Sequence, residues 1–194
     1  QPLLWSAETP VLYQLQIHAG DEYITEPVGL RYVQIKDGVF LINGTAVKFH
    51  GVNRHDSDPV TGYAISIEQM VCDLELMDYT DVVVDGRFIL AQRDVTLEWK
   101  GSPLCAQYGF YVIDEADLEC HGVVAAGLRE WPESYDILAD DPKWRELIVD
   151  RSRHLMQRDK NRPCVVIWSI GNESGWGGNT IAAIQYLHDE DTTR

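Results

Sequence analysis

The feature that most limits the fold is a repeated order of segments after Val47, in which a short apolar strand pattern is followed by a helix pattern. The strand patterns are "VKFHGVN", "YGFYVIDEAD" and "RPCVVIWSIGNE", and the helix patterns are "SIEQMVCDLELM", "DDPKWRELIVDRSRHLMQRD" and "NTIAAIQYLHDE". Near-continuous apolar strands that alternate with helices predict a parallel sheet covered by helices, an α/β fold.

Each of these strands ends in polar residues, which are Asn53, Arg54 and His55, then Asp114, Glu115, Asp117 and Glu119, then Asn172 and Glu173. In a (β/α)8 TIM barrel such strand ends meet on one face, where the active site lies. The chain holds about half of the eight strands that a barrel needs. We therefore expect a partial barrel that does not close by itself.

Local signals predict where two of the helices begin. Ser66 and Gln69 have the spacing of a capping box ahead of the first helix. Pro142 is expected as the first residue of the second helix, because its fixed φ suits that position.

The residues before Val47 have a β pattern. "VLYQLQIHA" places Val11, Tyr13, Leu15 and Ile17 on one face, as in a half-buried antiparallel strand. Asp37-Gly38 and Asn43-Gly44 then favour two tight hairpins. We interpret this part as the last strands of a β-sandwich and a short hairpin connection.

Charge and cysteine content limit the partners. Acidic residues number 31 against 16 basic ones, a formal net charge of −15, which argues against nucleic acid and anionic membranes as partners. The four cysteines form no C-x-x-C pair, so we expect reduced, mostly buried thiols and a cytoplasmic protein. The chain begins without Met or a signal segment, and we expect it to be a piece of a longer protein.

Glu173 is the first candidate for chemistry. A carboxylate at the end of a barrel strand can serve as general acid/base, nucleophile or metal ligand. The alternative is a structural glutamate that caps the next helix or pairs with an arginine. The small residues around it, "GN" before and "SGWGG" after, favour a functional role.

Glu119 and His121 form the second candidate. In extended chain both point to the same side, and an oxygen with an imidazole nitrogen is the start of a site for a divalent ion such as Mg²⁺. The alternative is a surface acid beside a histidine. Cys120 lies between them and should face away. "GVNRHDSDP" would by itself be a polar loop.

These motifs together resemble glycoside hydrolase family 2, and within it the large bacterial β-galactosidases. The matching segments are "LWSAETPVLY", "GLRYVQIKDGVFLINGTAVKFHGVNRHD", "YGFYVIDEADLECHG", "DDPKW" and "RDKNRPCVVIWSIGNESG". They span nearly the whole chain. The Glu-x-His pair favours a galactosidase over the related β-glucuronidases.

The resemblance implies roles for five residues. Glu173 is similar to the general acid/base. Glu119, His121 and Glu173 are similar to the ligands of an active-site Mg²⁺; Na⁺ is a further candidate ion, with ligands outside this chain. His55 is similar to a histidine of the galactose subsite, and Asn172 to an asparagine that binds the sugar's 2-hydroxyl.

The implied organisation is the end of an immunoglobulin-like β-sandwich in residues 1–36 and the first half of the barrel in residues 37–194. The implied reaction is the retaining hydrolysis of terminal non-reducing β-D-galactosides such as lactose, by a homo-oligomer in full-length form. The family's nucleophile falls beyond Arg194, so we expect the isolated chain to be inactive. The alternatives are another family 2 activity, β-glucuronidase or β-mannosidase, and a non-catalytic complementing fragment.

One segment, residues 78–103, departs from the family. The family has there a strand that ends in a sugar-contacting histidine, and this chain has no histidine between Asp78 and Pro103. Asp85-Gly86 predicts a hairpin turn within it. A local frameshift and genuine divergence are the two explanations, and both put the second barrel strand and one substrate contact in question.

Overall fold

The fold is described from a computed structural model of the chain. It describes residues 1–54, 57–62, 64–77, 82–86, 101–120 and 136–194, and every structural statement below concerns these residues. In this part of the chain, none of the helices combines the length and the apolar character needed to cross a membrane.

Five strands lie before the parallel sheet. A two-stranded antiparallel sheet is formed by β1 (Tyr13–Ala19) and β2 (Glu22–Val28), and a three-stranded one by β3 (Val33–Lys36), β4 (Val39–Ile42) and β5 (Thr45–Ala46). Both predicted turns are confirmed. Asp37 and Gly38 join β3 to β4 with φ of 52° and 76°, and Asn43 and Gly44 join β4 to β5 with φ of 54° and 81°. Two successive residues with positive φ are the requirement of a type I′ hairpin.

The predicted half-burial of the first strand is wrong for this chain. All seven residues of β1 are exposed, with Leu15 at 47% and Ile17 at 43%. The alternation that we took for a buried face is present in the strand, but β1 pairs only with β2 in its sheet. A two-stranded ribbon has no second layer to bury its apolar side.

The predicted parallel sheet is confirmed. Its order is β6 (Gly51–Arg54), β7 (Val82–Gly86), β8 (Tyr111–Glu115) and β9 (Val165–Ser169), and all three pairings are parallel. The helical segments are α1 (Ile67–Leu76), α2 (Gly101–Tyr108), α4 (Asp136–Asp140), the 3₁₀ turn η2 (Pro142–Trp144), α5 (Arg145–Asp159) and α6 (Gly178–Glu190). Among the described residues this is an open sheet of four strands, as expected for half a barrel.

The hairpin expected at Asp85-Gly86 is wrong. These two residues are the last of β7, which pairs with β6 on one side and β8 on the other. The second parallel strand is therefore present in the divergent segment. Backbone pairing to two neighbours outweighs the local turn preference of an Asp-Gly pair. Residues 87–100, in the rest of that segment, lie outside the described part.

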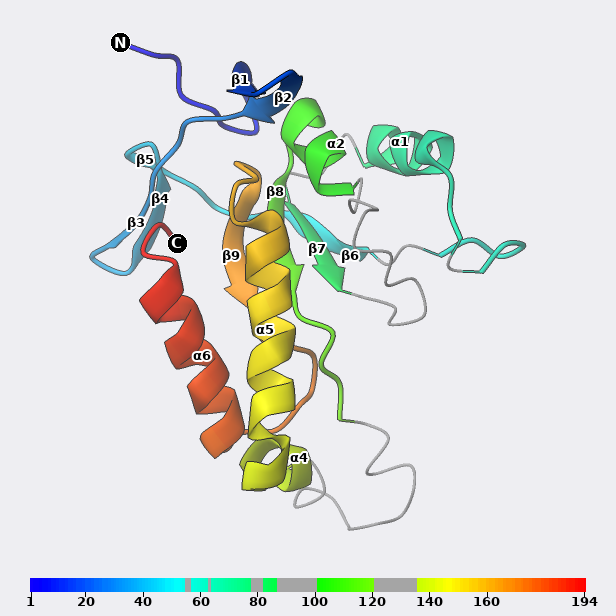
Figure 1. The fold of residues 1–194 in the computed structure, drawn as a ribbon, viewed down its shortest axis with the longest axis vertical. Coiled ribbons are helices and arrows are strands. Elements are labelled where there is room, and N and C mark those ends of the chain that lie inside the picture. Colours follow the sequence, from blue (N-terminus) through cyan, green and yellow to red (C-terminus); the bar gives the residue numbers. More distant parts are fainter. Residues whose placement is uncertain (55–56, 63, 78–81, 87–100, 121–135) are drawn as a thin grey trace.

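The helices begin as the local signals indicate. The Ser66 hydroxyl accepts a hydrogen bond from the Gln69 amide at the start of α1, although the Gln69 side chain donates to Asp73 at 2.9 Å and not back to Ser66. Pro142 begins the turn η2, which leads directly into α5. In the view of Figure 1, α5 runs along β8 and β9 with α6 beside it, and it buries Ile148, Leu155 and Met156.

Trp5 joins the N-terminal segment to the parallel sheet. Its side chain is fully buried, its indole meets the Tyr111 ring edge-on at 5.8 Å between centroids, and its Nε1 donates to the Ala106 carbonyl at 2.8 Å. Tyr111 begins β8 and Ala106 belongs to α2. The core around Trp5 thus fixes the N-terminal end of β8, one of the strands that lead to the candidate site.

Candidate active site

Backbone contacts continue past the ends of β8 and β9. The Ala116 amide donates to the Ser169 carbonyl, and the Asn172 amide donates to the Leu118 carbonyl, both at 2.9 Å. An isolated parallel bridge pairs Glu119 with Asn172. The chain segments that carry Glu119 and Glu173 therefore lie side by side beyond the sheet, as the convergence of strand ends predicts.

The backbone around Glu173 has an unusual conformation. Glu173 has φ of 41°, between Gly171 at 144° and Gly175 at 75°. A non-glycine residue in this region costs about 1–2 kcal/mol, and such strain is concentrated at functional sites. A Cβ atom on Gly171 would lie 2.5 Å from the Leu118 carbonyl oxygen, so only glycine allows this approach between the two segments.

The helix-capping alternative for Glu173 is wrong. Gly177 is the N-cap of α6, and the Thr180 hydroxyl accepts a hydrogen bond from the Gly177 amide at 2.9 Å. Glu173 lies four residues before that cap, and its side chain is exposed, as are those of Asn172 and Glu119. The three predicted site residues that the structure describes are thus accessible together at one edge of the sheet.

The side chains next to Glu119 alternate as expected. Cys120 is 1% exposed, so it faces away from the side that Glu119 occupies. Burial raises the pKa of the Cys120 thiol, against the opposing effect of a hydrogen bond with Ser174. Cys105 and Cys164 are also buried and Cys72 is exposed, and all four cysteines are free, which confirms the predicted thiol state.

The structure describes two of the three residues that are predicted to bind Mg²⁺. Glu119 and Glu173 offer carboxylate oxygens, the donors that Mg²⁺ takes. Among the residues that the structure describes, no three His, Cys, Asp or Glu side chains form a group that could hold a metal ion. The third predicted ligand, His121, and the predicted sugar contact, His55, lie outside the described residues. The chemistry of the two described donors fits the ion, and the full set stays a prediction.

The other acids of the "DEADLE" segment have structural partners. Buried Asp114 lies 3.5 Å from Arg158 of α5, Asp117 pairs with Arg151 of α5 at 2.7 Å, and Glu115 accepts a hydrogen bond from the Ser169 hydroxyl at 2.7 Å. The sequence pattern alone placed all of these acids at the active face. Of the four, Glu119 is the one whose side chain is exposed.

Arg54, at the end of β6, also has a structural partner. It is 7% exposed and its guanidinium lies 3.2 Å from Asp73 of α1. This ion pair fastens the first helix to the end of the first parallel strand. Arg54 was a polar strand-end residue without an assigned role in the sequence, and the structure gives it this one.

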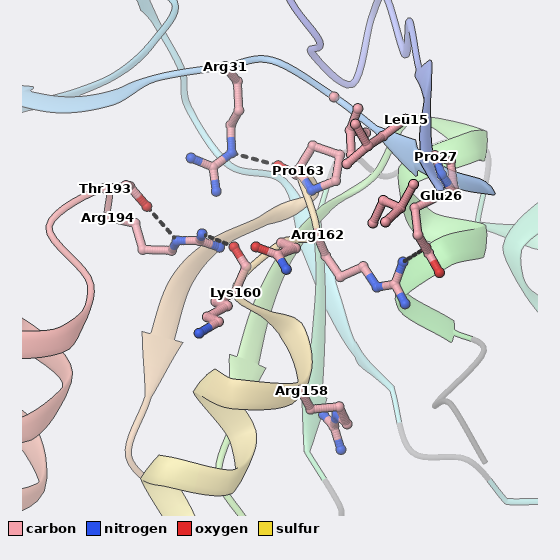
Figure 2. Close-up of a pocket in the computed structure, with 14 residues that line it drawn as sticks. Leu15, Glu26, Pro27, Arg31, Arg158, Lys160, Arg162, Pro163, Thr193 and Arg194 are labelled. Atoms are coloured by element: carbon pink, nitrogen blue, oxygen red, sulfur yellow. Dashed lines mark hydrogen bonds and ion pairs between the residues drawn. The ribbon is translucent and has the colours of Figure 1, made fainter. Parts of the chain in front are cut away.

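A hollow of about 590 Å³ lies at the other end of β9. Figure 2 shows its basic side chains, and several of these contact other groups of the chain itself. Arg31 donates to the Pro163 carbonyl at 2.6 Å, Arg194 donates to the Lys160 carbonyl at 2.6 Å, and Arg162 lies 3.8 Å from Glu26. Burial, with the nearby charge of Arg194, lowers the pKa of Arg31 to about 10. This hollow is lined by residues of β1 and β2 and of the segment that leads into β9, and it is separate from the candidate site.

Comparison with known proteins identifies the family. A family model described as "Glycosyl hydrolases family 2, TIM barrel domain" matches residues 33–194. The chain is 41% identical to a β-galactosidase of Staphylococcus xylosus over 197 residues and 39% identical to one of Actinobacillus pleuropneumoniae over 212 residues. These alignments cover 100% and 98% of this chain. The chain spans 19% and 21%, respectively, of the length of those relatives.

Solved structures support the same fold. A β-glucuronidase from an uncultured Clostridium species superposes with a TM-score of 0.78 at 25% identity, over 100% of this chain and 32% of that one. A β-D-glucuronidase of Dictyoglomus thermophilum gives 0.76 at 23% identity, over 100% and 33%. The parallel sheet and the family match agree, and the chain belongs to glycoside hydrolase family 2, in its TIM barrel domain.

Proposed function

We propose that this chain is part of a β-galactosidase, which hydrolyses terminal non-reducing β-D-galactosides such as lactose with retention of configuration. The observation that carries the proposal is the identity of 37–41% to curated β-galactosidases over 98–100% of the chain. The adjacent placement of the Glu119 and Glu173 segments supports it, because the Mg²⁺ site implied by the resemblance takes carboxylate oxygens from both segments.

Glu173 is the proposed general acid/base. It would protonate the leaving oxygen as the glycosidic bond breaks and would then take a proton from the attacking water. A retaining enzyme needs a second carboxylate about 5–5.5 Å away as nucleophile, and we place that group outside these 194 residues. Asn172 would donate a hydrogen bond to the 2-hydroxyl, a contact that strengthens in the transition state. His55 would line the galactose subsite.

Glu119, His121 and Glu173 are the proposed ligands of Mg²⁺. The bound ion would supply a positive charge that orients these carboxylates and stabilises negative charge on oxygen. The bridge between Glu119 and Asn172 supports this set, since it holds the segment of Glu119 beside the segment of Glu173. Na⁺ would be a further ion of the complete enzyme.

The finer organisation is also a proposal. Residues 1–36 would end an immunoglobulin-like sandwich and residues 37–194 would form the first half of the barrel. The exposed apolar residues of β1 and β2 support the assignment of residues 1–36 to a sandwich. In a sandwich such residues are covered by a second sheet. A cytoplasmic location is proposed from the reduced state of the four cysteines, and a homo-oligomeric complete enzyme from the resemblance.

Two alternatives are tied to observations. The superposition on β-glucuronidases keeps that activity as a candidate. The described sheet has β6 and β9 at its two edges, and unpaired edges favour association with another chain. A non-catalytic fragment that complements a partner is therefore the second alternative.

A substrate panel tests the proposal. The polypeptide encoded by the complete reading frame that contains these residues would be assayed on 4-nitrophenyl β-galactoside, β-glucuronide and β-mannoside, with and without EDTA. We expect galactoside hydrolysis that weakens when Mg²⁺ is removed, and no turnover by the 194-residue chain alone. Preference for the glucuronide would overturn the assignment, and turnover by the 194-residue chain would overturn the placement of the nucleophile.

A further inference from the structure

We propose that Ser174 is a positioning residue, whose hydroxyl holds the backbone of Glu173 against the segment that carries Glu119. The inference rests on the proposed function of Glu173 for its catalytic consequence. Its structural part stands on contacts of the described residues alone. In the sequence, Ser174 directly follows Glu173 within "GNESG".

The Ser174 hydroxyl lies at the centre of the contact between the two segments. Its Oγ lies 2.8 Å from the Leu118 carbonyl oxygen and 2.8 Å from the Asn172 carbonyl oxygen. A hydroxyl has one proton, so the two carbonyls share it. The side chain is 8% exposed, and little water is available to replace these bonds.

The Leu118 and Asn172 carbonyls, which accept from the Ser174 hydroxyl, link it to the backbone conformation of Glu173. Asn172 and Ser174 flank Glu173, so a bond from the Ser174 hydroxyl to the Asn172 carbonyl closes the backbone around the residue with φ of 41°. The bond to Leu118 fixes that closed turn to the residue immediately before Glu119. One side chain therefore sets both the turn at the proposed acid/base and its distance from the neighbouring carboxylate.

Two other features depend on the same hydroxyl. The Leu118 carbonyl also accepts the Asn172 amide at 2.9 Å, so the hydroxyl and this amide join the same two segments, and loss of the hydroxyl leaves the amide bond to open more readily with the segment. A Cβ on Gly171 would lie 3.1 Å from the Ser174 Oγ, which means that glycine at this position leaves room for the hydroxyl.

The first test measures the hydrogen bond without any assay of activity. Ser174→Ala is compared with wild type by amide hydrogen exchange of the 194-residue chain, with Asn172 as the reporter. A lost hydrogen bond of ordinary net strength corresponds to about a fivefold change in an opening equilibrium, so we expect the Asn172 amide to exchange about fivefold faster. An unchanged Asn172 rate would overturn the inference.

Matched variants separate positioning from general loss of packing. Ser152→Ala removes a hydroxyl that is also buried, on α5, and that has no hydrogen-bond partner among the described residues; we expect the wild-type rate at Asn172. Ser174→Thr keeps the hydroxyl and should exchange near the wild-type rate. If Ser174→Ala does not fold, Ser174→Cys keeps the shape with a weaker donor, and its Asn172 amide should exchange faster than in wild type. A Ser152→Ala effect equal to that of Ser174→Ala would overturn the inference.

The second test measures the catalytic consequence in the polypeptide from the complete reading frame. We expect Ser174→Ala to lower kcat on 4-nitrophenyl β-galactoside more than it raises KM, and Ser174→Thr to restore most of kcat. Faster exchange at Asn172 with an unchanged kcat would show a purely structural serine and overturn the positioning role. A wild-type protein without galactosidase activity would refute the proposed function instead, and the exchange rates would still decide on Ser174.

Discussion

Replacing Gly171 by alanine tests the close approach of the two site segments. At φ of 144° an alanine is strained, and its Cβ would lie 2.5 Å from the Leu118 carbonyl oxygen. The backbone strain costs of order 1–3 kcal/mol. If Leu118 moves away, the hydrogen bonds that its carbonyl accepts from Asn172 and Ser174 are lost, at about 1 kcal/mol each. We expect a total loss of about 3–5 kcal/mol.

Gly38→Ala is the matched control. Gly38 also has a positive φ, 76°, but a Cβ there would meet no atom within 4 Å. Its cost should be the left-handed strain alone, about 1–2 kcal/mol. Urea unfolding followed by circular dichroism measures both variants. With a slope of about 2 kcal/mol per molar urea, the excess cost of Gly171→Ala should lower its midpoint by about 1 M below that of Gly38→Ala. Equal midpoints would refute the argument that backbone contact with Leu118 requires glycine.

Two further predictions concern the ends of the sheet. Trp5→Phe removes the hydrogen bond to Ala106 and part of a fully buried ring, so it should lower the free energy of unfolding in urea by about 2–3 kcal/mol. Trp176→Phe, at a residue that is 64% exposed, is the control and should be nearly neutral. Equal effects of the two substitutions would contradict the role given to Trp5. At Asp191 burial would raise the pKa, but hydrogen bonds from Thr193 and Trp168 and the charge of Arg194 hold the pKa below its usual range. The carboxylate therefore stabilises the fold above about pH 4 and ceases to do so as the pH falls through its lowered folded-state pKa. Asp191→Asn should flatten the acid side of the stability curve, and an unchanged acid side would refute this.

The sequence was sufficient where structure depends on neighbouring residues. The Asn43-Gly44 hairpin follows from two residues that tolerate positive φ, and the start of α1 follows from the Ser66 hydroxyl. The parallel sheet also followed from local patterns, because apolar strands and helices with distinct periods alternate along the chain. The placement of Glu119 beside Asn172 followed from the rule that parallel strand ends converge.

The sequence was insufficient where partners are distant. Asp85-Gly86 has the local preference of a turn, and only pairing with two neighbouring strands makes it part of β7. The acids Asp114 and Asp117 could not be distinguished from Glu119 without the position of α5, whose arginines pair with them. Ser174 gave no signal beyond being a small polar residue among glycines, since its acceptor Leu118 lies 56 residues away in the chain.

The central claim is that Glu173 protonates the leaving group, and the dependence on the leaving group tests it most directly. Glu173→Gln would be assayed in the polypeptide from the complete reading frame on lactose and on 2,4-dinitrophenyl β-galactoside, whose phenolate leaves without protonation. Glu190→Gln, an exposed residue at the end of α6, is the control. We expect kcat/KM on lactose to fall about 10²–10⁴-fold, with a much smaller loss on the dinitrophenyl substrate. An equal loss on both substrates would contradict the role of Glu173 as acid.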